Sequence, residues 1–221
     1  MAEADKSITQ RTACLIVPAF NEAGTVASVL KVASESGIFS TIVCVDDGSR
    51  DDTADAARTI AGVTVISQKN AGKAMALKAG LDATSEPVVT FLDADLLNLK
   101  HEHIRALVEP VTSGTAKATI GIFKGGRGPT DFAQKIAPMI SGQRALLRSL
   151  MADFEGWQSA GFGIEHALND HLKSKGVKML EVAFEGASHL MKEEKHGLLS
   201  GFVRRLKMYA EIARYNLRKP R

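Results

Sequence analysis

Acidic and amide side chains follow three short apolar runs of the sequence. Asn21 and Glu22 come after ACLIV, Asp47 comes after IVCV, and Asp93 and Asp95 come after VVTFL. A spacing of two places both carboxylates of the third group on the same side of an extended chain. Mg²⁺ and Mn²⁺ bind oxygen ligands, often one or two carboxylates together with phosphate oxygens. The pattern predicts a divalent-cation site suited to a nucleotide diphosphate, with a pair of turn or N-cap aspartates as the alternative.

Apolar runs and helical spacings alternate along the first half of the chain. Strands are expected at 14–17, 41–45, 63–67 and 88–92, and helices at 23–33, 53–60 and 73–81. This order predicts an α/β fold whose mostly parallel sheet is flanked by helices. Ligands of such sheets bind beyond the carboxyl ends of the strands, so the polar residues above are expected to meet at one edge.

The second half is less regular and shows no repeat or change in composition that would mark a boundary. Strands are expected at 118–123 and 178–183, and helices at 143–151, 163–174 and 201–217, with a basic glycine-rich loop at 124–129. His101 and His103, which start a further helical segment, are expected to be solvated. The 221 residues are therefore predicted to form a single domain.

Composition excludes several classes of protein. Lys and Arg number 28 against 25 for Asp and Glu, and a net charge of +3 does not indicate a nucleic-acid binder. No segment approaches the roughly 20 apolar residues that cross a bilayer, and the polar N-terminus does not resemble a signal peptide. Cys14 and Cys44 both lie in apolar runs and are expected to be buried, reduced thiols, which indicates a cytoplasmic location.

Two common nucleotide-binding motifs are absent. Gly72 and Lys73 lack the upstream glycine of a Walker A loop, and Ala74 stands where that loop needs Ser or Thr. No GxGxxG follows the first expected strand, so a dinucleotide fold is not supported.

Four motifs in the first half resemble family 2 glycosyltransferases of the GT-A fold: PAFNE (18–22), VDDGSRDDT (45–53), NAGKAMALKAG (70–80) and FLDAD (91–95). The resemblance implies that Asp95 holds a Mg²⁺ or Mn²⁺ ion on the donor diphosphate. It also implies a set of donor-nucleotide residues, namely Pro18, Ala19, Phe20, Asn21, Glu22, Asp47, Lys73, Asp93 and Ala94.

The second half is similar to glucosyl-3-phosphoglycerate synthases and related retaining enzymes through GGRGPT (125–130), PMISGQRAL (138–146), GFGIE (161–165) and SHLMKEEKHG (188–197). This likeness implies a second metal ligand at His189 and a reaction-centre residue at Glu165. It places Arg127 and Thr130 at the acceptor. The chain departs from those synthases two residues on either side of the metal histidine, where they carry Arg and Asn and this sequence has Ala187 and Met191.

Glu165 has a structural alternative, because a carboxylate in the first turn of a helix also interacts favourably with the helix dipole. As a functional group it could act as general base in an inverting transfer or support positive charge on the sugar in a retaining one. The residues leave both outcomes open.

The C-terminal stretch 201–221 carries seven basic residues and one acid, and its apolar residues recur at helical spacing opposite most of the basic ones. It is expected to form an amphipathic helix that packs on the domain, contacts a membrane surface or an anionic partner, or pairs two protomers. The resulting division is a flexible N-terminus at 1–12, a GT-A domain at 13–200 and this helix. Within the domain, 13–100 is the nucleotide-sugar half and 101–200 the acceptor half.

The sequence as a whole predicts a metal-dependent glycosyltransferase. The expected donor is a UDP-glucose or GDP-mannose type of sugar, and the expected acceptor is a small phosphorylated or polyprenyl-linked molecule. The expected location of the protein is the cytoplasm, and peripheral contact with the inner face of the membrane is a further alternative. The alternatives are a non-catalytic nucleotide-sugar binder or membrane adaptor, a nucleic-acid partner acting through the basic helix, and a nucleotidyltransferase. PAFNEAG lacks the glycine-rich basic loop that the last of these usually carries.

Overall fold

The computed structural model describes residues 12–124, 141–158 and 163–189. Arg127, Thr130 and the predicted helix at 201–217 lie outside these residues, as do Met191 and the N-terminal segment 1–11.

A seven-stranded sheet in the order β3-β2-β1-β4-β7-β6-β8 forms the centre of the molecule, and β5 and β9 form a separate pair. The strands are β1 (Ala13–Ala19), β2 (Phe39–Asp46), β3 (Val63–Ser67), β4 (Val88–Phe91), β5 (Leu96–Leu97), β6 (Ala118–Lys124), β7 (Arg144–Leu147), β8 (Leu180–Glu185) and β9 (Ser188–His189). Pairing is parallel throughout the large sheet except along β7, which runs antiparallel to both β4 and β6. The predicted α/β fold with a mostly parallel sheet is confirmed.

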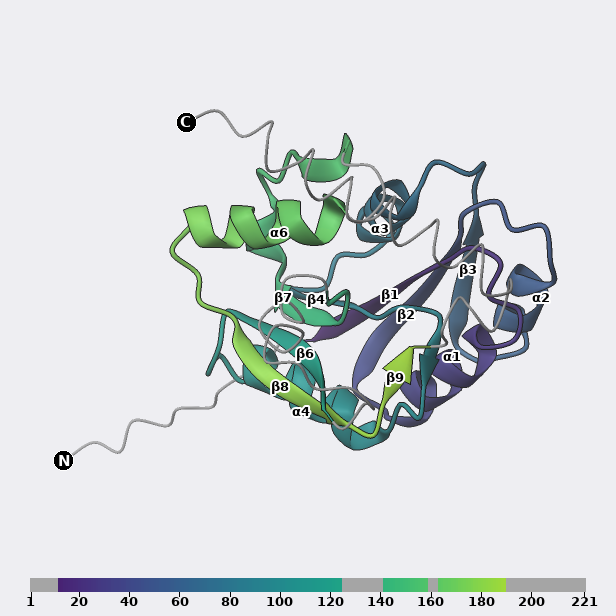
Figure 1. The fold of residues 1–221 in the computed structure, drawn as a ribbon, viewed down its shortest axis with the longest axis horizontal. Helices are drawn as coiled ribbons and strands as arrows, with labels where there is room; N and C mark the ends of the chain where they lie inside the picture. Colours follow the sequence, from purple (N-terminus) through teal and green to yellow (C-terminus); the bar gives the residue numbers. More distant parts are fainter. Residues whose placement is uncertain (1–11, 125–140, 159–162, 190–221) are drawn as a thin grey trace, which may run out of the picture.

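Helices cover both faces of the sheet and give three layers (Figure 1). On one face lie α1 (Val26–Glu35), α2 (Thr53–Arg58) and α4 (His101–Thr112), and on the other lie α3 (Lys73–Asp82), α6 (Gly163–Ser174) and the 3₁₀ turns η1 (Arg148–Met151) and η2 (Gly156–Gln158). Each face has its own apolar core, built on β-strand residues that alternate between the two sides. On α1 the buried residues Val26, Val29, Leu30 and Ala33 form the single stripe that its sequence spacing predicts.

The expectation of a helix at 143–151 is wrong. Arg144–Leu147 is the inner strand β7, paired with β4 on one side and β6 on the other, and only Arg148–Met151 turns as a 3₁₀ helix. The residues RALL favour a helix by intrinsic propensity. Hydrogen bonds to the two neighbouring strands outweigh that preference. Without β7 between them, β4 and β6 would each have backbone N–H and C=O groups without a partner on that side.

The expectation of solvated histidines holds for His101 but is wrong for His103. The His101 side chain is 53% exposed, whereas His103 is 4% exposed and stacks on Phe184 with ring centroids 4.9 Å apart. His103 belongs to the buried stripe of α4, one turn before Leu107. Burial lowers the pKa of this imidazole, so it is neutral when folded near pH 7.

Cys14 and Cys44 are buried and unpaired in β1 and β2, as predicted. Burial, with a smaller contribution from Asp46, raises the pKa of the Cys44 thiol to about 12. Both thiols are therefore core residues and not nucleophiles. In the three described segments, no helix has the length and apolar character needed to cross a membrane.

Candidate functional site

The loops that follow β1 and β2 are joined by hydrogen bonds at the carboxyl edge of the sheet. The Asn21 amide N–H donates to Ser49 Oγ (2.9 Å), and the Arg50 N–H donates to Asn21 Oδ1 (2.8 Å). The Glu22 N–H donates to Thr53 Oγ1 (2.7 Å). Asn21 adopts a positive φ of 56°, which Asn tolerates better than most residues. The PAFNE and DDGSRDDT motifs thus form one fixed surface.

Three of the predicted donor-nucleotide residues differ in exposure at this surface. Phe20 is 43% exposed, Ala19 is buried, and Pro18 is partly buried. The Phe20 side chain is thus open to solvent, while the Ala19 side chain belongs to the core, and contact of either residue with a nucleoside stays a prediction. Ala94, at the end of β4, is likewise buried.

The Asp47 carboxylate holds the loop that leads into α3. It accepts hydrogen bonds from the backbone N–H groups of Ala71 (2.9 Å) and Gly72 (2.8 Å) and from Gln68 Nε2 (2.7 Å). Gly72 has a φ of 93°, a conformation that requires glycine, and Lys73 follows as the first residue of the helix. Asp47 therefore fixes the start of α3, where Lys73 is the first helical residue. A direct contact of Asp47 with a nucleoside stays a prediction.

Lys73 lies between two acidic residues that are far away in the sequence. Its Nζ is 2.6 Å from Asp93 Oδ1 and 2.7 Å from Glu165 Oε1. Burial acts to lower the pKa of Lys73, but the two carboxylates outweigh it, and the net pKa is raised above the usual value. The ammonium is therefore charged at neutral pH, and the structure brings together three of the predicted site residues.

Glu165 is 2% exposed, in the first turn of α6. Its Oε1 contacts Lys73, while its Oε2 is buried and has no hydrogen-bond donor among the described residues. A buried carboxylate oxygen without a donor costs free energy that a ligand hydroxyl could recover. This atom is an acceptor available to a bound ligand.

Residues 141–144, to which the sequence assigned no role, support Asp93 from the side opposite Lys73. Gln143 Nε2 donates to Asp93 Oδ2 (2.7 Å), and Ser141 Oγ donates to Gln143 Oε1 (2.9 Å). Arg144, the next residue, is 1% exposed. The signal that could have found them is SGQR itself, a polar tetrapeptide directly before an apolar run.

Gly142 leaves no room for a side chain beside Asp93. A Cβ there would lie 2.5 Å from Asp93 Oδ2 and 2.7 Å from Oδ1, so Gly142→Ala must displace the carboxylate from Lys73 and Gln143. We expect the free energy of unfolding, measured in urea, to fall by about 1–3 kcal/mol.

Gly24→Ala is the matched control, because a Cβ at Gly24 has no neighbour within 4 Å. Its expected effect is below about 0.5 kcal/mol. Equal unfolding free energies for the two variants would show that the Asp93 carboxylate has another position of the same energy.

The predicted metal ligands Asp95 and His189 lie far apart in the sequence. The short antiparallel pair β5–β9 sets Leu96 opposite His189, so the backbone of His189 lies beside the residue that follows Asp95. Asp95 is partly buried, and the side chain of His189 lies outside the described part of the chain. Within that part, no three His, Cys, Asp or Glu side chains form a cluster that could hold a metal. The register brings the backbone of His189 close to the Asp95 segment, and the ligation of one cation by both residues stays a prediction.

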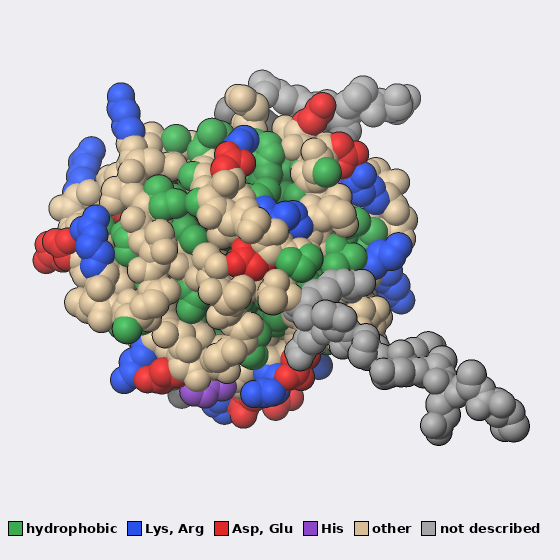
Figure 2. Space-filling model, turned by 180° about the vertical axis from the view of Figure 1, so that it is seen from behind, with side chains coloured by type: hydrophobic (Ala, Val, Ile, Leu, Met, Phe, Trp, Pro, Cys, Tyr) green, Lys and Arg blue, Asp and Glu red, His purple; other side chains and the backbone are tan. Residues whose placement is uncertain are grey.

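The described side chains form no large patch of one charge on the face shown in Figure 2. Basic and acidic side chains both lie along its rim, and side chains of both signs also lie near its centre. The nucleic-acid alternative rests on the basic stretch 201–221, which lies outside the described residues, so this surface does not test it.

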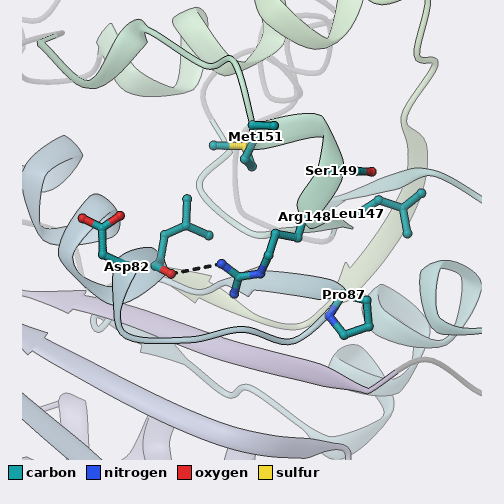
Figure 3. A pocket seen from close by; sticks show the side chains of 8 residues that line it. Asp82, Pro87, Leu147, Arg148, Ser149 and Met151 are labelled. Carbon is teal, nitrogen blue, oxygen red and sulfur yellow. Dashed lines mark hydrogen bonds between the residues drawn. The ribbon is translucent and has the colours of Figure 1, made fainter.

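An open cavity of about 700 Å³ lies at the opposite edge of the sheet and not at this site (Figure 3). It is lined by Leu81, Asp82, Pro87, Leu147, Arg148, Ser149, Met151 and Ala152. Its cation, Arg148, donates to the carbonyls of Glu86 (2.6 Å) and Leu81 (3.0 Å) and to Thr84 Oγ1 (2.6 Å). The guanidinium thus fixes the end of α3 to the start of β4, which is a structural role.

Curated relatives are similar over parts of the chain. Glucosyl-3-phosphoglycerate synthase of Mycobacterium tuberculosis (strain ATCC 25618 / H37Rv) is 34% identical over 125 residues, which cover 52% of this chain and 38% of the synthase. Undecaprenyl-phosphate 4-deoxy-4-formamido-L-arabinose transferase of Edwardsiella ictaluri (strain 93-146) is 28% identical over 210 residues, which cover 84% of this chain and 63% of that enzyme. The matches therefore span less than two thirds of either relative.

A solved structure shares the fold. The crystal structure of glucosyl-3-phosphoglycerate synthase from Mycobacterium tuberculosis in complex with Mn²⁺, UDP and glucosyl-3-phosphoglycerate superposes with a TM-score of 0.70 and 25% identity. The superposition covers 86% of this chain and 78% of that one. The sequence model of "Glycosyl transferase family 2" matches residues 14–169, which include Asp47, Lys73, Asp93 and Glu165. The chain belongs to glycosyl transferase family 2.

Proposed function

We propose that the chain transfers a hexose from a nucleotide-diphosphate sugar to a phosphate-bearing acceptor, with Mg²⁺ or Mn²⁺ as cofactor. The observation that carries the proposal is the convergence of Lys73, Asp93 and Glu165 next to Asp95, at the carboxyl edge of the sheet. The similar synthase structures contain UDP with Mn²⁺ or Mg²⁺, and one contains UDP-glucose and phosphoglyceric acid.

The cation supplies charge stabilisation for the departing nucleotide, and Asp95 and His189 are the residues that would hold it. The loops after β1 and β2 bind the nucleoside. Because their backbones are already joined by hydrogen bonds, little order has to be gained on binding.

Lys73 and Glu165 act at the transferred sugar. The protonated Lys73 pairs with both carboxylates and holds them in place. Glu165 Oε2 then accepts a hydrogen bond from the sugar or acceptor, or stands close to the positive charge that develops on the sugar. The stereochemical outcome depends on which of these it does, and product anomer analysis by NMR distinguishes them.

The acceptor class rests on the relatives and on one departure from them. Phosphoglyceric acid and undecaprenyl phosphate, the acceptors in the names of similar proteins, share a phosphate group. Ala187 is described and buried, so an Arg side chain at that position of the synthases has no counterpart here. This favours a phosphate acceptor other than phosphoglycerate, with Arg127 and Thr130 as its predicted contacts. A cytoplasmic location of the chain, its peripheral contact with a membrane and its pairing as a homodimer are parts of the same proposal.

The test is donor turnover by the purified chain. We expect hydrolysis of UDP-glucose or GDP-mannose, measured as released nucleotide, that requires Mn²⁺ or Mg²⁺, is lost with EDTA, and returns when the cation is restored. Release should increase when a phosphate acceptor is added. Equal rates with and without the cation would refute the metal dependence. Binding of a nucleotide sugar with no turnover would favour the non-catalytic binder instead.

A further inference from the structure

Arg144 is the largest fully buried side chain of the described core, although it carries a charge. It sits in β7, with backbone partners Phe91 in β4 and Ile120 in β6. Burying a guanidinium is costly unless its N–H groups and its charge are both compensated. A position in the middle of the sheet does not by itself require Arg, because the neighbours Ala145 and Leu146 are also fully buried there.

The guanidinium connects the two elements that carry the acidic site residues. Its Nη2 donates to the carbonyl oxygen of Ser141 (2.5 Å), and its Nη1 donates to Asn169 Oδ1 (3.2 Å). Ser141 belongs to the segment that orients Gln143 on Asp93. Asn169 lies one turn after Glu165 on α6. Arg144 therefore joins the support of Asp93 to the helix that carries Glu165.

Charge gives a second, independent reason. Asp93 and Glu165 bring two negative charges to the site, and Lys73 brings one positive charge. Burial lowers the pKa of Arg144 below its usual value, and the nearby charges of Glu165 and Asp93 act against this and favour the charged guanidinium. With Arg144 included, the four buried or half-buried groups sum to zero, which is the arrangement that limits the cost of burying ions.

We propose that Arg144 is a positioning residue for the transfer: it fixes α6, and so Glu165, against the carboxyl end of β4, and it completes the charge balance of Asp93, Lys73 and Glu165. Its effect on the rate rests on the proposed function. Its link to the two carboxylates does not, and a stability measurement can test that link alone.

The activity arm uses Arg144→Met, Arg144→Lys and Asn169→Ala in the full chain, with Arg105→Met as the matched control. Arg105 is an exposed residue of α4 that pairs with Glu109, one turn away on the same helix. We expect Arg144→Met to lower kcat for donor hydrolysis by at least about tenfold. The Kd for UDP or GDP with Mn²⁺, measured by calorimetry, should change by less than about threefold, because the nucleoside loops belong to β1 and β2.

Arg144→Lys keeps the charge and should recover part of kcat, and Asn169→Ala keeps all charges and should lower kcat alone. A merely structural role predicts a parallel loss of nucleotide affinity and no recovery by Lys. Unchanged kcat in Arg144→Met, or a loss of kcat matched by the loss of nucleotide affinity, would overturn the proposal. If Arg144→Met does not fold, the same criteria apply to Arg144→Lys and Asn169→Ala.

The stability arm is a double-mutant cycle between Arg144→Met and Glu165→Gln, followed by urea unfolding. If the two charges compensate each other, the pair of substitutions will differ from the sum of the single ones by about tenfold in the unfolding equilibrium constant. Additive effects would refute the charge balance. This arm needs no turnover, so wild-type inactivity would refute the proposed function while leaving the cycle able to decide on Arg144.

Discussion

Asp95→Ala is expected to lower metal-dependent donor turnover by about a thousandfold, equivalent to about 4 kcal/mol of transition-state stabilisation. The physical reason is that a carboxylate ligand fixes the cation on the diphosphate, where negative charge develops as the nucleotide leaves. Asp95 is only partly buried, so the unfolding free energy is expected to change by about 1 kcal/mol or less. Released nucleotide as a function of Mn²⁺ concentration is the measurement.

Asp55→Ala is the control for this variant. Asp55 is an exposed carboxylate of α2 that pairs with Arg58, so its removal deletes the same group away from the site. Turnover and stability are both expected to stay near those of the wild type. Wild-type turnover by Asp95→Ala would refute the assignment of this residue as a metal ligand, provided that its titration with Mn²⁺ is also unchanged.

Lys73→Met is expected to cause the largest loss of stability, about 3 kcal/mol, together with loss of turnover. Without the ammonium, the carboxylates of Asp93 and Glu165 face each other with side-chain exposures of only 17% and 3%. Removing one partner of a buried charge group leaves the remaining charge uncompensated. At lower pH a carboxyl group of the variant can take up a proton, which removes one of the two negative charges that Lys73 would otherwise balance. Stability lost at about pH 8 should then be partly regained at about pH 5.

Lys78→Met tests whether any lysine of α3 has this effect. Lys78 pairs with Asp82 at an exposed i, i+4 position, where ion pairs contribute about 0.5 kcal/mol or less. Urea unfolding of both variants across this pH range gives the comparison. An equal stability of Lys73→Met and Lys78→Met would mean that the three-residue ion group does not hold α3 and α6 together.

The first half of the fold could be predicted because its local and global signals agree. The strands around Cys14 and Cys44 are continuous apolar runs with residues that favour strands, and the stripe on α1 has helical spacing. The acidic ends of these strands then follow from the geometry of parallel sheets. This is why the convergence of Asp47 and Asp93 on one edge needed no tertiary information.

The errors lie where tertiary contacts decide. RALL favours a helix, yet Arg144–Leu147 is a strand because it fills the gap between β4 and β6. The polar neighbours of His103, Glu102 and His101, favour an exposed side chain. Its spacing from Leu107 nevertheless places it on the buried side of α4. That second error was avoidable from periodicity alone.

Part of the site was also beyond sequence reasoning. Lys73 and Glu165 lie 92 residues apart, and only the packing of α3 and α6 on one face of the sheet brings their helix starts together. Gln143 and Arg144 act through the register of β7, which was expected to be helical. The approach of the Asp95 segment to His189 depends on a backbone pairing of two residues per strand. No residue pattern in either segment predicts this pairing.

The antiparallel strand β7 has a consequence for how such a protein can diversify. The nucleotide-sugar half and the acceptor half are predicted to divide near residue 100, but β4 from the first part is hydrogen-bonded to β7 from the second. A recombination event or a designed chimera with its crossover at that boundary would give β4 a foreign neighbour at the centre of the sheet. The two predicted halves of the domain are therefore not expected to be interchangeable between proteins. New acceptor preferences are reached more readily by substitutions in the loops than by exchange of whole segments.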